Sequence, residues 1–117
     1  MAKTIGKPIP SDLNSDKNRD INTEALRVIT AKGEKIKLGG GKSSIEKHKA
    51  KGKLTARERI ALLTDEGADF LEIGLFTAYD MYKEQGGAPS AGVVCGIGII
   101  HGRECVIVAN DATVKAG

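Results

Sequence analysis

The sequence predicts an α/β protein in which helices come first and a β-hairpin comes last. Two apolar, mostly β-branched runs, residues 93–100 and 105–109, flank His101-Gly102, a connection short enough for a tight turn. Apolar residues at helical spacing and two capping-box patterns indicate helices in the first half of the chain. These features follow one another along 117 residues, a length that suits one modest domain.

The first predicted helix follows a polar leader. Residues 1–19 are expected to be flexible, because they are polar, contain two prolines and show no hydrophobic periodicity. The helix is predicted to begin at about Asp20 and to end between Gly33 and Leu38, before three consecutive glycines at 39–41. Its apolar residues lie at helical spacing: Ile21, Ala25, Val28 and Ile29.

Two shorter helices are predicted after the glycines. Each would begin at a hydroxyl and a carboxylate three residues apart, an arrangement in which both groups satisfy N–H groups at a helix start. The two pairs are Ser43 with Glu46 and Thr55 with Glu58. The second helix should pack through one apolar face, made of Ala56, Ile60 and Leu63. Beyond it, residues 70–73 are predicted to be extended and residues 86–90 to form a loop.

The hairpin strands are predicted to be covered on both faces, because few of their positions alternate with polar residues. Gly96 and Gly98 interrupt the first strand, and glycine inside a strand often marks a bulge or a close backbone approach. Asn110, Asp111 and Thr113 follow the second strand. They either cap a turn or line a ligand site, since α/β proteins tend to place ligands at the carboxyl ends of strands.

Charge is distributed unevenly along the chain. The net charge is +3, but residues 32–59 carry ten Lys and Arg against three Glu, a net charge of +7. Such a block suggests an anionic partner, although lysine-rich helices are also common as solvated surfaces. RNA binding is disfavoured, because no aromatic side chains that could stack on bases are interleaved. A small phosphorylated ligand needs only a few cations and a helix N-terminus.

Several other site types are disfavoured by the sequence. Residues 39–43 look like a phosphate-binding P-loop, but Ile36 stands where that motif needs glycine and a helix precedes it. Cys95 and Cys105 lack metal-ligand spacing and are expected to be free thiols in a reducing cytoplasm. No metal site or nucleophilic constellation is found in the sequence. No signal peptide or membrane-length segment is found either, so a cytoplasmic location is expected.

Three stretches resemble the carboxyltransferase (β) subunit of biotin-dependent acyl-CoA carboxylases: GGGKSSIEKHKAKGKLTARERI, FLEIGLF and GGAPSAGVVCGIGIIHGRECVIVANDATVKAG. The segment GKLTARERI, residues 52–60, is typical of the wider family, and VANDATVK, residues 108–115, is similar to the methylcrotonyl-CoA carboxylase type. The resemblance covers roughly residues 39–117. It implies that residues 20–117 are the truncated N-terminal part of a crotonase-like (ClpP/crotonase ββα-spiral) α/β domain.

The resemblance also implies a reaction and its participants. The family transfers a carboxyl group from carboxybiotin, held on a partner carrier domain, to an acyl-CoA, and backbone N–H groups in oxyanion holes stabilise the enolates. The glycine motifs of those holes would lie downstream, so no catalytic residue is expected here and the segment alone should be inactive. The expected partners are a biotin carboxylase or biotin carboxyl carrier subunit and further carboxyltransferase subunits, with neither nucleic acid nor a membrane.

Six residues are implied to line the acyl-CoA site. Arg57 and Arg59 would meet the nucleotide end, and Asn110, Thr113, Lys115 and Gly117 would line the floor of the pocket. Three alternatives remain open. The arginines could make only helix salt bridges, the segment could be an oligomer interface, or it could be a basic module that binds anions or RNA.

Overall fold

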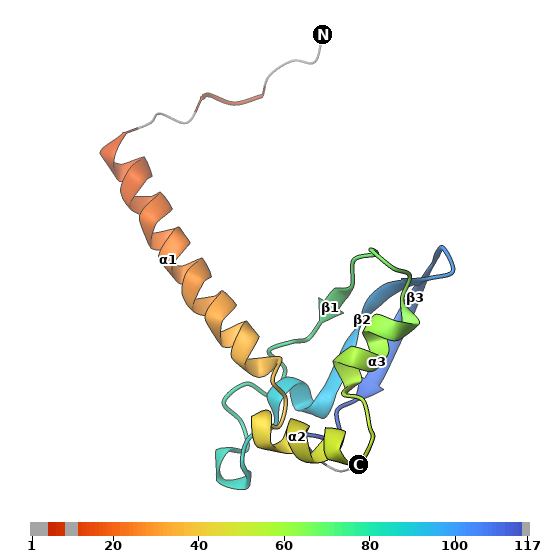
Figure 1. Cartoon of the computed structure of the whole chain (residues 1–117). Helices are drawn as coiled ribbons and strands as arrows, with labels where there is room; N and C mark the ends of the chain where they lie inside the picture. The colour runs from red at the N-terminus through yellow and green to blue at the C-terminus, as the bar shows by residue number, and fades with distance from the viewer. Residues whose placement is uncertain (1–4, 9–11, 116–117) are drawn as a thin grey trace. The chain divides into compact units, whose positions relative to one another are not determined.

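The computed structural model describes residues 5–8 and 12–115 (Figure 1). The chain divides into two compact units, Met1–Lys32 and Gly33–Gly117. Parts of the predicted leader, and Gly117 at the other end, lie outside the described residues. Within the described ranges, no helix is long and apolar enough to cross a membrane.

Helix α1, Leu13–Ile36, begins earlier than the sequence predicted. The predicted start near Asp20 relied on apolar periodicity, whereas the first turns are polar. These turns are stabilised locally, since the Asp12 carboxylate accepts a hydrogen bond from the backbone N–H of Ser15 at 2.8 Å. Ion pairs three residues apart, such as Glu24 with Arg27 at 2.7 Å, support the middle of the helix.

The second unit contains a three-stranded antiparallel sheet in the order β1-β2-β3, with helices before it in the chain (Figure 1). Its elements are α2 (Lys42–Ala50), α3 (Ala56–Leu63), β1 (Leu71–Ile73), the 3₁₀ turns η1 (Lys83–Gln85) and η2 (Pro89–Gly92), β2 (Val93–Ile100) and β3 (Arg103–Asn110). The three consecutive glycines occupy the turn between α1 and α2. The predicted order of helices followed by a hairpin is confirmed.

The hairpin turn has the geometry that its sequence predicted. His101 and Gly102 have φ values of 48° and 74°, and positive φ at both central residues fits a two-residue type I′ turn. The pairing runs without a bulge from Ile100 opposite Arg103 to Val93 opposite Asn110. A long-range contact supports the turn, because the Asp65 carboxylate accepts hydrogen bonds from the backbone N–H groups of His101 and Gly102, both at 2.7 Å.

This contact makes the stability of the hairpin depend on pH. Hydrogen bonds from the backbone of Gly102, and then of His101, hold the pKa of Asp65 below its ordinary value of 3.8. A lowered pKa in the folded state stabilises the fold above the unfolded-state pKa, about 3.9, and this stabilisation is lost as the pH falls through the folded-state pKa. Asp65→Asn should therefore be less stable near neutral pH and should lose less stability on acidification.

Urea unfolding at pH 6 and pH 3 tests this expectation. Other carboxylates titrate in the same range, so the informative quantity is the difference in pH dependence between Asp65→Asn and the wild-type chain. Asp69→Asn, a replacement of a nearby exposed carboxylate for which the structure gives no hydrogen bond, is the matched control. Equal pH dependence in the Asp65 variant and the wild type would contradict a capping role for Asp65.

The core lies between α3 and the hairpin. Ala56 and Ile60 pack on Val94 and Ile107, and all four side chains are buried. The prediction that Leu63 shares this face was wrong, since its side chain is 51% exposed. The core contact is made by the first two turns of α3, and Leu63 is the last helical residue.

The prediction that both faces of the strands are covered was wrong for the described residues. The α3 side of the sheet is covered, but Val106 and Val108 on the opposite side of β3 are 73% and 65% exposed. The apolar runs therefore do not imply two covered faces in this chain, because the helix that packs on the sheet, α3, covers one side only.

The two glycines inside β2 allow a close approach, as predicted. A Cβ atom on Gly96 would lie 2.5 Å from the ring of Phe70 and would overlap the carbonyl oxygen of Leu71. A Cβ atom on Gly98 would lie 2.7 Å from the methyl group of Thr64. Since the ladder is continuous, the glycines provide space for the segment before β1 and do not form a bulge.

One of the two predicted capping boxes is present. At α3 the Thr55 hydroxyl accepts from the backbone N–H of Glu58 at 3.2 Å, and the Glu58 carboxylate accepts from the backbone N–H of Thr55 at 2.9 Å. The box at Ser43 was wrong, because α2 begins at Lys42 and its N-cap is Gly41, two residues before Ser43. Gly41 has a φ of 89°, which glycine adopts easily.

Candidate functional site

The segment that leaves β3, residues 110–115, is called here the exit loop. Its turn is stabilised by its own side chains. The Asp111 carboxylate accepts hydrogen bonds from the backbone N–H of Thr113 at 3.0 Å and from the Thr113 hydroxyl at 2.6 Å. The backbone N–H of Asp111 donates to the carbonyl of Gly92 at 2.8 Å, which connects the loop to the start of β2. The polar residues after β3 thus do form a capped turn.

Two of the three glycines at 39–41, a segment called here the triglycine turn, pack directly on the exit loop. The backbone N–H of Gly40 donates to the Thr113 hydroxyl at 3.1 Å. A Cβ atom on Gly40 would overlap the carbonyl oxygen of Thr113, and one on Gly39 would overlap the Asp111 carboxylate. The sequence predicted only a helix break at these glycines, and this contact was missed. A single glycine is enough to end a helix, so the presence of three in a row was the feature of the sequence that could have indicated this contact.

Arg57 and Arg59 have different surroundings, because residues two apart on a helix do not face each other. The Arg57 guanidinium donates two hydrogen bonds to the Glu72 carboxylate, at 2.7 and 2.8 Å. The side chains of this pair are only 28% and 14% exposed. Arg59 is exposed and makes no ion pair within the part of the chain that the structure describes.

A small cavity brings Arg57 and Thr113 together. Its volume of about 30 Å³ leaves room for about one water molecule. It lies between the turn that precedes α2, the helices α2 and α3, and the exit loop, and it is lined by Lys37, Leu38, Ile45, Thr55, Ala56, Arg57, Asp111 and Thr113. A cavity of this size belongs to the packing of the loop and cannot hold a substrate.

A larger hollow of about 450 Å³, called here the basic pocket, lies beside the exit loop. It is lined by His48, Lys53, Leu54, Arg59 and Ala112. The ring Nε2 of His48 lies 2.9 Å from the Leu54 carbonyl oxygen, which fixes the orientation of the imidazole. The volume lies within the range of small-molecule sites, and the cationic side chains in its lining favour an anionic ligand.

The nearest carboxylate on α3 is already engaged. Glu58 forms an ion pair with Lys49 at 2.5 Å and caps the helix through Thr55. These interactions, with Lys49 first, lower the pKa of Glu58, so it stays ionised at neutral pH. The charges of Lys53 and Arg59 are therefore available to a ligand.

The structure brings together only some of the six residues that the resemblance implied. Arg57 and Thr113 share the small cavity, and Arg59 lines the basic pocket. Asn110 is exposed at the end of β3, and the Lys115 ammonium donates to the Gln85 carbonyl at 2.6 Å. Neither of these two residues lines the two cavities, and Gly117 lies outside the described residues.

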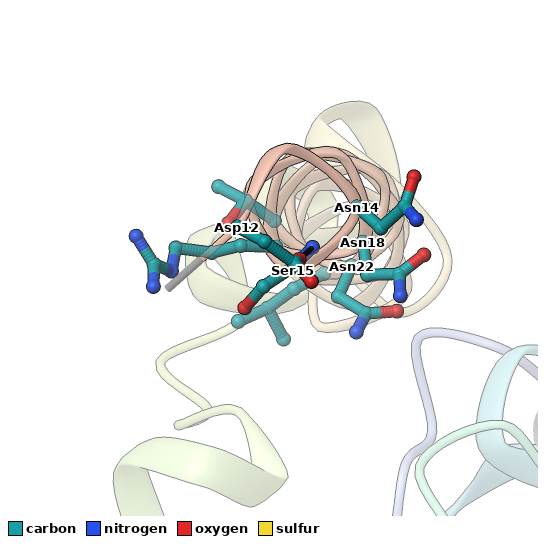
Figure 2. A pocket seen from close by; sticks show the side chains of 8 residues that line it. Asp12, Asn14, Ser15, Asn18 and Asn22 are labelled. Carbon is teal, nitrogen blue, oxygen red and sulfur yellow. Dashed lines mark hydrogen bonds between the residues drawn. The ribbon is translucent and has the colours of Figure 1, made fainter. Parts of the chain in front are cut away.

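Two further features do not form sites. Figure 2 shows a hollow on α1, along which Asn14, Asn18 and Asn22 project from one side of the helix. All its lining residues belong to α1 or immediately precede it, and a single helix cannot enclose a ligand.

In the described ranges no three His, Cys, Asp or Glu side chains gather as metal ligands. Cys95 and Cys105 lie on opposite faces of the sheet and are free.

Fold and site together define the class of protein. The second unit has the crotonase-like α/β fold of carboxyltransferases over part of their length, with a basic pocket beside the segment that leaves its hairpin. The chain belongs to the carboxyl transferase domain family, which it matches over residues 47–117. The family resemblance noted in the sequence is thereby confirmed.

Similar proteins with reported names agree with this assignment. The chain is 47% identical over 109 residues to the mitochondrial methylcrotonoyl-CoA carboxylase β chain of Dictyostelium discoideum, covering 91% of this chain and 18% of that protein. It is 49% identical over 103 residues to the biotin-dependent 3-methylcrotonyl-coenzyme A carboxylase β1 subunit of Mycobacterium tuberculosis, covering 88% and 18%. The chain thus spans less than a fifth of the length of these relatives.

Solved structures show the same arrangement. The β subunit of P. aeruginosa geranyl-CoA carboxylase superposes with a TM-score of 0.74 at 28% identity, covering 99% of this chain and 21% of that chain. Transcarboxylase 12S with methylmalonyl-coenzyme A bound superposes with a TM-score of 0.68 at 34% identity, covering 76% of this chain and 18% of that chain.

Proposed function

We propose that this chain forms part of a carboxyltransferase β subunit of a biotin-dependent acyl-CoA carboxylase. The subunit would transfer a carboxyl group from carboxybiotin to an acyl-CoA of the methylcrotonyl-CoA type. The observation that carries the proposal is the family match over residues 47–117, together with 47–51% identity to three methylcrotonyl-CoA carboxylase β chains. Residues 47–117 include α3, the hairpin and every residue of the basic pocket.

Within this function, the basic pocket would bind phosphate groups of CoA. Arg59 and Lys53 supply the positive charge, and a guanidinium can bind a phosphate through two parallel hydrogen bonds. Arg57, Asn110, Lys115 and Gly117 remain predicted contacts along the same ligand. Arg57 contributes chiefly by tying α3 to β1, since both of its described hydrogen bonds go to Glu72.

The participants follow from the same family. Carboxybiotin would arrive on a biotin carboxyl carrier, loaded by a biotin carboxylase subunit. A homo-oligomer of carboxyltransferase subunits is supported by transcarboxylase 12S, whose structure is described as a hexamer assembly. The cytoplasmic location inferred from the sequence stays a prediction, because three of the similar β chains are named as mitochondrial.

Replacing Arg59 with alanine tests the proposal in the assembled carboxylase that contains this chain. Loss of a charge-assisted hydrogen bond to phosphate at a partly exposed site should raise the KM for the acyl-CoA about tenfold, with little change in kcat. Steady-state carboxylation at varied acyl-CoA concentrations measures both constants.

Arg103→Ala is the matched control, because Arg103 is an exposed arginine at the tip of the hairpin and lines none of the pockets described above. Its KM should equal that of the wild-type enzyme. An unchanged KM for Arg59→Ala would remove the basic pocket from acyl-CoA binding. Absence of any biotin-dependent carboxylation by the wild-type assembly would overturn the proposed function itself.

A further inference from the structure

We infer that Gly40, Asp111 and Thr113 form a latch that fixes the exit loop beside the basic pocket, and that Thr113 is a positioning residue. The inference deepens the proposed function and rests on it for the identity of the ligand. The latch itself consists of contacts between described residues, of which Gly40 and Thr113 lie 73 positions apart in the chain. Its members are joined by hydrogen bonds of 2.6, 3.0 and 3.1 Å.

The hydrogen bonds of Thr113 show why its role is positional. A threonine hydroxyl has one donor hydrogen and two acceptor lone pairs. The donor is used on the Asp111 carboxylate at 2.6 Å, and one acceptor receives the backbone N–H of Gly40 at 3.1 Å. The hydroxyl therefore has no hydrogen left to donate to a phosphate, and its remaining lone pair would repel one.

Glycine at positions 39 and 40 is a steric requirement of the latch. Side chains there would overlap Asp111 and Thr113, so the triglycine turn can approach the exit loop only without Cβ atoms. Asp111 is also held by the hydrogen bond that its backbone N–H donates to the Gly92 carbonyl oxygen. The exit loop is thus anchored both to the sheet and to the turn between α1 and α2.

The latch reaches the basic pocket through Ala112. This residue lies between the two latch residues of the exit loop and forms part of the pocket lining together with Arg59. A shift of the loop would move one wall of the pocket relative to α3, without any change in the charged side chains. The latch should therefore set the affinity for the ligand although none of its hydrogen-bonding side chains touches the ligand.

Two substitutions at one position separate the hydroxyl from the volume of the side chain. In the assembled carboxylase, Thr113→Val should raise the KM for the acyl-CoA roughly fivefold, the effect expected for loss of about one hydrogen bond, and Thr113→Ser should restore it. Thr30→Val on α1, a replacement of an exposed threonine, is the control. A Thr113→Val enzyme with unchanged KM, or a serine variant as impaired as the valine variant, would overturn the inference.

Hydrogen exchange of the same enzyme reports on the latch independently of the ligand. The amide of Gly40 should exchange roughly fivefold faster in Thr113→Val and at the wild-type rate in Thr113→Ser. Unchanged exchange in the valine variant would overturn the latch even if carboxylation proceeds. Faster exchange combined with no effect of Arg59→Ala on KM would instead contradict the proposed acyl-CoA site.

Coupling between Thr113 and Arg59 distinguishes positioning from simple destabilisation. The two side chains line different cavities, so independent effects would multiply in the double variant. If the latch positions the pocket wall opposite Arg59, the KM of Thr113→Val/Arg59→Ala should rise by clearly less than the product of the single effects. A purely multiplicative result would show that Thr113 acts on acyl-CoA binding independently of Arg59 and would overturn its role in positioning the pocket wall.

Discussion

Gly96→Ala is expected to lower the free energy of unfolding by about 3 kcal/mol, the upper end of the usual cost of overpacking a core. Gly96 lies in the middle of β2, between Glu72 of β1 and Ile107 of β3. Its Cβ atom would point towards the α3 side of the sheet, into the ring of Phe70 and the carbonyl oxygen of Leu71. The ring could rotate away, but the carbonyl belongs to the backbone of β1, so the strand itself would have to shift.

The loss would be large for a domain of this size, because folded domains are typically stabilised by only about 5–15 kcal/mol. Shifting β1 would also disturb Glu72, the partner of Arg57, and would loosen the contact of Phe70 with the core. Gly96 does not lie in the left-handed region of φ, so the expected cost is steric and does not come from backbone strain.

Urea unfolding followed by circular dichroism measures this effect. Gly52→Ala is the control, since Gly52 has a φ of 72° and a Cβ atom there would meet no other atom within 4 Å. Backbone strain alone should cost that variant about 1–2 kcal/mol. If Gly96→Ala were as stable as the wild-type chain, the close approach of Phe70 and Leu71 to β2 would be refuted.

Arg57→Ala is expected to lower the free energy of unfolding by about 2 kcal/mol. Removing one member of a fully buried ion pair costs about 3–5 kcal/mol, because the remaining charge is left without a partner. The expected value is smaller here, since the Arg57 side chain is 28% exposed and water partly screens the pair. Glu72, with 14% exposure, would keep an unpaired charge against the sheet.

The pair also allows a double-mutant cycle. Glu72→Ala should cost a similar amount, and the double variant should lose less than the sum of the two single losses. Arg57→Lys should recover only part of the stability, because an ammonium cannot make the two parallel hydrogen bonds of a guanidinium. Additive losses in the double variant would mean that the pair contributes no coupling energy.

A surface ion pair in the same chain is the matched comparison. Glu24 and Arg27 on α1 are 60% and 71% exposed, although their side chains approach to 2.7 Å. Arg27→Ala should therefore cost no more than about 0.5 kcal/mol. Urea unfolding of both arginine variants gives the contrast, and an equal loss in the two would argue against a special role for Arg57.

The predictions that succeeded relied on local chemistry. The turn at His101-Gly102, the capping box of Thr55 and Glu58, and the helix break at 39–41 each depend on residues within four positions of one another. Backbone preferences and short hydrogen bonds act over this distance in almost any tertiary context, so the pattern was sufficient. The Ser43 box failed because α2 begins at Lys42, with Gly41 as its N-cap, so Ser43 already lies inside the helix.

The predictions that failed concerned contacts between residues that are far apart in the sequence. From the sequence, Arg57 and Arg59 looked like equivalent cations. In the structure, Arg57 binds Glu72, whereas Arg59 lines the basic pocket. The apolar strands suggested two covered faces, but burial depends on which elements pack on the sheet, and α3 covers one side. The spacing of Arg57 and Arg59 shows that the two side chains point in different directions, but neither their spacing nor that of the apolar strand residues shows which elements pack against them.

By itself, the sequence determined the helices-then-hairpin order, the position of the hairpin turn and the family, because turns, caps and motif order depend on neighbouring residues. Only the tertiary structure decided that the triglycine turn meets the exit loop, which places Thr113 in a latch and Arg59 in a basic pocket. The physical reason is that glycine leaves space without specifying what fills it. The residues that pack against such a glycine are known only from the folded structure, in which segments 73 residues apart in the chain come into contact.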